Sequence, residues 1–158
     1  MGVEVLKHQL VKHIKGGEAF YPIDKMLDEI TFEKVGIRPS GLPYSFYELF
    51  YHIVYAQVDI IDFCTAENYS QSDWPKDYWP KTQSPSNIND WIKLKEDYFN
   101  DRETFSNYII NEEIDLSEVV KHGETQTLLR EILLIIEHTA YHTGQMLIVL
   151  RFLDLYEN

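Results

Sequence analysis

The sequence predicts an all-α protein: a four-helix up-and-down bundle with one short extra helix and a long loop rich in tryptophan and proline. Apolar residues recur at helical spacing in four long segments and one short segment. No segment shows the apolar/polar alternation of a half-buried strand. The 158 residues suit a single domain, 1–158, which is long enough to bury a core without disulfides.

The first two helices are predicted before residue 31. A helix over roughly residues 3–15 has a stop at Gly16 and Gly17. Its apolar stripe consists of Leu6, Leu10, Val11 and Ile14. Pro22 can open a shorter helix, because proline fits the first helical turn. Its stripe consists of Ile23, Met26, Leu27 and Ile30. Residues 35–43 are predicted to form a loop.

The next helix has a clear start. Ser45 and Glu48 form the S-x-x-E pattern of a capping box. Apolar residues with helical period follow: Phe46, Phe50, Ile53, Ile60 and Cys64. Residues 66–86 contain three prolines and the segment WPKDYWP, which favours a long loop. We expect this loop to pack back on the bundle and seal its open side; an aromatic wall beside a ligand pocket is the alternative.

Two further helices complete the bundle. One is predicted from about Ile88 to Ile110, with an apolar stripe opposite a face rich in Lys, Asp and Glu. An acidic connector with Gly123 follows. The last helix is expected to begin near Thr125 and to run close to the C-terminus. Its segment LLREILLII is apolar around much of the circumference, which predicts a central helix buried on several sides.

Charge and composition exclude several kinds of partner. The formal net charge of −12 argues against nucleic acid and anionic membranes, since both attract clusters of Lys and Arg. No stretch is apolar for long enough to span a bilayer, and the N-terminus lacks the apolar segment of a signal peptide. The single cysteine, Cys64, fits a cytoplasmic location. Its core position favours an inert buried thiol over a nucleophile.

Three histidines indicate a metal site. His138 and His142 are one helical turn apart, so both imidazoles can reach one ion. Their neighbours are largely apolar, and burying an unpartnered imidazole costs roughly a few kcal/mol. His52 lies inside another apolar helix and can converge on the same ion in a bundle. Three nitrogen ligands leave a position open for water or substrate, as in catalytic zinc sites. The alternative is core histidines satisfied by hydroxyls or carbonyls.

Polar residues on the same helix faces are candidates for a general acid or base. They are Glu48, Asp59, Tyr141 and Gln145. Gln145 shares the face of the paired histidines and could bind a ligand or make an ordinary polar contact. Asp59 lies two turns after His52 and could accept an imidazole N–H, but a salt bridge to Arg151 or Arg130 explains it equally well.

Together these motifs resemble the DinB-like superfamily, nearly end to end. The matching segments, in order, are GGEAF, IRPSGLPYSFYELFYHIVYAQVDIIDF, WPKDYWP, the helix of Trp91, and HTAYHTGQMLIVLR. The resemblance implies a four-helix bundle with a divalent ion held by three histidines, which here fall on His52, His138 and His142. Spacing and burial select the same three residues. The pattern assigns no general acid or base beyond them.

The resemblance also implies partners. Such proteins are often homodimers, and some relatives are transferases that use low-molecular-weight thiols such as bacillithiol or mycothiol. We therefore expect a homodimer in which zinc or nickel activates a thiol or water for transfer to, or hydrolysis of, a small molecule. A non-catalytic protein that binds a metal or small ligand in the same pocket is one alternative. A bundle with structural histidines that acts through protein contacts is another.

Overall fold

The computed structural model describes residues 2–156 and is all-helical in that range. Its elements are α1 (Gly2–Lys15), α2 (Ile23–Glu29), α3 (Phe46–Thr65), the 3₁₀ helix η1 (Lys76–Tyr78), α4 (Ile88–Ile110) and α5 (Leu128–Phe152). The described residues form no strand, only an isolated bridge between Val119 and Thr127. The all-α bundle, with its short extra helix and long loop, is thereby confirmed.

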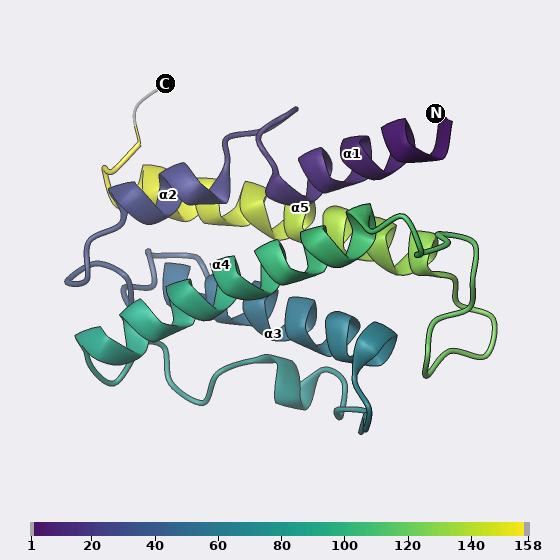
Figure 1. Ribbon diagram of the computed structural model, residues 1–158. Helices are drawn as coiled ribbons and strands as arrows, with labels where there is room; N and C mark the ends of the chain where they lie inside the picture. The colour runs from purple at the N-terminus through teal and green to yellow at the C-terminus, as the bar shows by residue number, and fades with distance from the viewer. Residues whose placement is uncertain (1, 157–158) are drawn as a thin grey trace.

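The long loop between α3 and α4 sets the direction of α4. Three hydrogen-bonded pairs mark its path back along α3: Tyr69 with Asp59, Tyr78 with His52, and Gln83 with Ser45. The loop therefore recrosses the length of α3, and α4 begins at the end of the bundle where α3 begins (Figure 1). As a result α3 and α4 run parallel, while α1 and α5 run in the opposite direction, so the order differs from simple up-and-down alternation.

The last helix starts three residues later than expected. The backbone N–H of Val120 donates to the carbonyl of Gln126 at 2.9 Å, and Thr127 pairs with Val119 in the bridge. This extended pairing keeps residues 125–127 out of the helix. The Thr127 side chain then accepts a hydrogen bond from the Arg130 N–H and caps α5.

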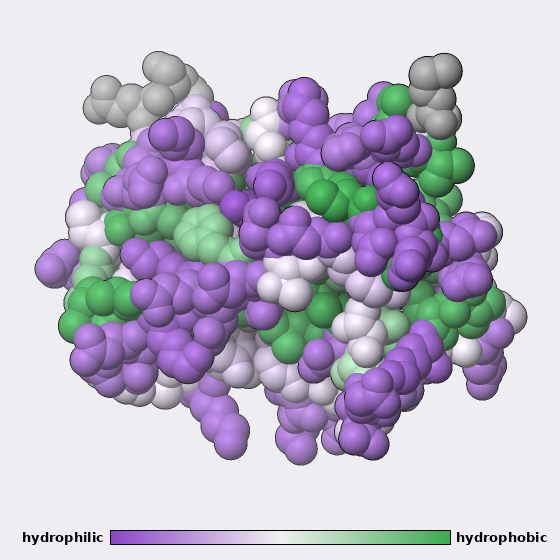
Figure 2. Space-filling view, viewed as in Figure 1, coloured by the Kyte–Doolittle hydropathy of each residue, from purple (hydrophilic) through white to green (hydrophobic). Residues whose placement is uncertain are grey.

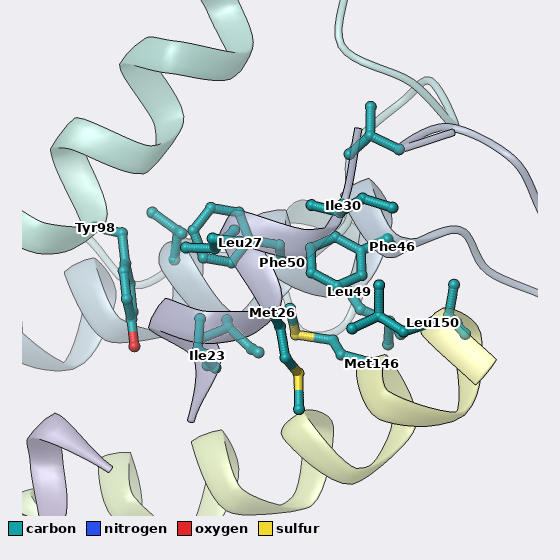
Figure 3. Packing of buried hydrophobic residues seen from close by; sticks show 14 of the residues in the cluster. Ile23, Met26, Leu27, Ile30, Phe46, Leu49, Phe50, Tyr98, Met146 and Leu150 are labelled. Carbon is teal, nitrogen blue, oxygen red and sulfur yellow. The ribbon is translucent and has the colours of Figure 1, made fainter. Parts of the chain in front are cut away.

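The core consists of two apolar clusters along the bundle. The first joins α2 to the beginning of α3 and the end of α5, and Figure 3 shows Met26, Phe50 and Met146 packed within it. The second joins α1 to the ends of α3 and α4 and the beginning of α5. On α5 the first cluster begins at Met146 and the second ends at Ile135, so His138 and His142 occupy the stretch between them.

The outer surface is mainly polar. Figure 2 shows hydrophilic side chains over most of one face, with separate apolar patches between them. Within residues 2–156, no helix combines the length and hydropathy that a membrane span requires.

The helix α5 packs against α1, α2 and α3, as its apolar sequence predicted. One side of it stays open, since Leu133 is half exposed and Tyr141 is 66% exposed.

Candidate metal centre

The fold brings together the three histidines that the sequence selected. His52 projects from α3, and His138 and His142 project from the facing side of α5. One ring nitrogen from each residue lies within 4.8 Å of the other two. The ring centroids are 4.5–4.8 Å apart. His52 and His142 are buried and His138 is half-buried, so the cluster lies inside the bundle.

The tautomer of His52 is set by the long loop. Its Nδ1 lies 3.0 Å from the backbone carbonyl oxygen of Tyr78. A carbonyl only accepts, so Nδ1 carries the proton and Nε2 keeps its lone pair. The Nε2 atom of His138 lies 3.0 Å from Nε2 of His52, and therefore His138 donates from Nε2 in this structure. His138 can ligate through Nε2 once that proton has moved to its Nδ1.

A glutamine sets the tautomer of the third ring. Nδ1 of His142 lies 2.6 Å from Oε1 of Gln145, so Nδ1 donates and Nε2 keeps its lone pair. Gln145 was expected to be a polar neighbour of the site, and the structure shows that it orients the ring of His142. Two of the three rings present a fixed nitrogen lone pair.

Burial keeps the cluster neutral. Desolvation, together with smaller contributions from His142 and His52, lowers the pKa of His138 to about 3. Burial also lowers the pKa of His52 and of His142, against smaller opposing effects of their hydrogen bonds to Tyr78 and Gln145. Neutral imidazole is the form that binds metal ions. All three rings are therefore in a ligating charge state at neutral pH.

Aromatic rings of the long loop cover His52. Trp79 stacks on the imidazole with a centroid distance of 4.2 Å and an interplanar angle of 3°. Tyr78 and Trp74 lie at 6.3 and 6.1 Å from the same ring. The loop thus packs back on the bundle, as expected, and also forms an aromatic wall beside the histidines.

A family model described as the DinB family matches residues 1–153. The chain belongs to the DinB family. Comparisons with curated proteins and with solved structures gave no match. The match spans all three histidines and confirms the resemblance that the motifs predicted.

The other polar candidates of this DinB protein have defined contacts. Asp59 accepts hydrogen bonds from the hydroxyls of Tyr69 at 3.1 Å and Tyr78 at 2.5 Å, whereas the sequence suggested an imidazole or an arginine. Arg130 pairs with Glu131 at 2.7 Å. These contacts were not foreseen because the two tyrosines come from a loop whose path the sequence did not define. Tyr141 lies with its ring 4.9 Å from that of His142.

Glu48 fixes the start of α3 rather than the chemistry of the site. Its carboxylate accepts from the Ser45 N–H at 2.8 Å and completes the expected capping box. It also accepts two hydrogen bonds from the Arg38 guanidinium. The helix therefore begins six residues, nearly two turns, before His52 with a defined geometry, which sets where the histidine projects.

Replacing Glu48 with glutamine is expected to flatten the fall in stability at acid pH. Burial raises the pKa of Glu48, but hydrogen bonds from Arg38 and Ser45 outweigh it and leave the pKa below its usual value of 4.5. Such a carboxylate stabilises the fold above about pH 4.5, and this contribution is lost as the pH falls through the lowered folded pKa. Urea denaturation from about pH 7 to about pH 3 checks this. Parallel curves for the wild type and Glu48→Gln would contradict it.

The DinB chain also holds a cavity about one helical turn away from the histidines, none of which is among its lining residues. Its volume is about 470 Å³, and its lining includes Asp59, Tyr78, Arg130 and Leu134. Tyr78 bonds His52, and Leu134 precedes His138 by one turn of α5. The cavity is of the size that small-molecule ligands occupy.

Cys64 is buried elsewhere, in the second core cluster. Burial raises the pKa of its thiol to about 12, so it is an inert thiol, as expected.

Proposed function

We propose that His52, His138 and His142 hold a divalent metal ion, zinc or nickel first, and that the protein is a metal-dependent enzyme acting on a small molecule. The single observation that carries the proposal is the convergence of three neutral imidazoles inside the bundle. When bound, such an ion lowers the pKa of a thiol or water in its open position, which makes a nucleophile available at neutral pH. The reaction would be transfer of a low-molecular-weight thiol, or hydrolysis.

The donor set fits the ion. Imidazole nitrogens suit zinc, nickel, copper and iron, and three of them leave a position open. Tyr78 and Gln145 hold the rings of His52 and His142 through their Nδ1 protons, which is the usual arrangement behind histidine ligands. Trp79 excludes water from one face of His52.

Metal analysis tests the site. Untagged protein, purified without a chelating resin, is compared with His52→Ala and with the double variant His138→Ala/His142→Ala. The matched control is His8→Ala/His13→Ala, which removes two exposed histidines from α1. We expect near-stoichiometric metal in the wild type and the control, and background metal in the site variants. Equal background in all four proteins would overturn the proposal.

Ligand binding then separates an enzyme from a binding protein. Thiols and azide are added to the cobalt-loaded protein, whose absorption spectrum reports the coordination of the ion. A spectral change shows an open position, and product formation with a set of electrophiles shows turnover. Binding without product would support the non-catalytic alternative, in which the pocket senses or sequesters its ligand.

A further inference from the structure

We infer that Asp59 is a positioning residue for His52, acting through Tyr78 of the long loop. Its effect on metal affinity rests on the proposed function, whereas its effect on the His52 tautomer does not. Asp59 lies seven residues after His52 on α3, about 10 Å along the helix axis, so it acts only through an intermediate residue.

Tyr78 connects the two residues. Its hydroxyl donates to Oδ2 of Asp59 at 2.5 Å, and its backbone carbonyl accepts from Nδ1 of His52 at 3.0 Å. One loop residue is therefore held at two points along α3. The next residue, Trp79, stacks on the His52 ring, so the same anchor also places the stacking ring.

Side-chain hydrogen bonds attach this part of the loop to α3. The loop contains only the three-residue η1 as regular structure, so its own backbone hydrogen bonds define little of its path. Asp59 accepts from two loop phenols, Tyr69 and Tyr78, and bonds to a carboxylate are about twice as strong as neutral ones. Burial and the Asp59 carboxylate raise the pKa of both phenols, so each remains a donor.

The position of the Tyr78 carbonyl determines which nitrogen of His52 can ligate. With the carbonyl in place, the proton stays on Nδ1 and the Nε2 lone pair faces His138. If the carbonyl moves, the proton can occupy either nitrogen. The fraction of His52 with a lone pair on Nε2 then falls.

Nitrogen-15 NMR of metal-free, histidine-labelled protein tests the tautomer. The His52 signals are identified by their absence in His52→Ala. The test variants are Asp59→Asn and Tyr78→Phe. The matched control is Tyr69→Phe, which removes the other hydroxyl on Asp59 but belongs to a residue whose carbonyl does not contact His52. Circular dichroism and thermal melting establish that each variant is folded.

We expect the wild type and Tyr69→Phe to show His52 protonated at Nδ1. Tyr78→Phe should move the two nitrogen shifts of His52 toward each other, and Asp59→Asn should do so in the same direction. Wild-type shifts in folded Tyr78→Phe and Asp59→Asn would overturn the inference. If Tyr78→Phe does not fold, Asp59→Asn decides alone.

Zinc competition with a chromophoric chelator provides a second readout. Loss of partners behind histidine ligands weakens metal affinity by about 10–100-fold, so we expect a loss of about tenfold in Tyr78→Phe and none in Tyr69→Phe. If the wild type binds no zinc, the proposed function fails, while the NMR result on metal-free protein still decides the role of Asp59. Equal affinity in the two phenylalanine variants would overturn the inference for the metal site.

Discussion

Excess zinc is expected to stabilise the wild-type protein strongly. At free zinc about a thousand times the dissociation constant, the free energy of unfolding rises by about 4 kcal/mol. For a chain of this size that corresponds to an increase in melting temperature of about 8–16 °C. The reason is that His52 and His138 are 86 residues apart in the sequence, so the unfolded chain cannot present the same ligand set.

The histidine variants make this prediction specific to the site. His138→Ala/His142→Ala should melt at the same temperature with and without zinc, whereas His8→Ala/His13→Ala should show the full increase. Calorimetry with zinc and then with nickel also ranks the two candidate ions. An equal increase in the site variant and the control would locate the stabilising zinc elsewhere and contradict the assignment.

A single truncation in the second core cluster is expected to have the next largest effect. Ile109 on α4 is completely buried, and its cluster includes Leu10, Phe105 and Ile132. Ile109→Ala removes apolar contacts and leaves a cavity, at a cost of about 2–5 kcal/mol in the free energy of unfolding. Denaturation by urea measures it directly.

The same helix provides the matched control. Ile92, also on α4, is 41% exposed. Ile92→Ala makes the identical chemical change where little apolar area is withdrawn from the core, so its effect should stay within about 0.5 kcal/mol. Comparable losses in the two variants would mean that the packing of α4 differs from this structure.

Local patterns predicted the helices because the apolar periodicity and the caps are properties of neighbouring residues. The helices α3 and α4 begin where Ser45 and Ile88 indicated. The start of α5 was placed too early, because the pairing of Thr127 with Val119 is made across a turn and leaves no helical signature. The parallel course of α3 and α4 likewise depends on where a proline-rich loop attaches, which periodicity does not encode.

The candidate site divides in the same way. His138 and His142 followed from spacing on one helix, and His52 followed from its place on an apolar helix that a bundle would bring alongside. The residues that orient the histidine rings were harder to predict from the sequence. Gln145 was found on the shared face, but the contact from Tyr78 is made by a backbone carbonyl, and any residue type has one. Only the stiff Trp-Pro pairs around Tyr78 marked that segment as more than a connector.

The division of the histidines between α3 and α5 has a consequence during synthesis. A ribosome that has completed α3 has made His52, but the other two histidines emerge only with the last long helix. A chain that stops before residue 138 retains one of the three candidate ligands. For this protein, the amount of metal bound per chain would therefore report the fraction of chains in which α5 has been translated and has docked on α3. Metal content would thus serve as an assay of complete folding.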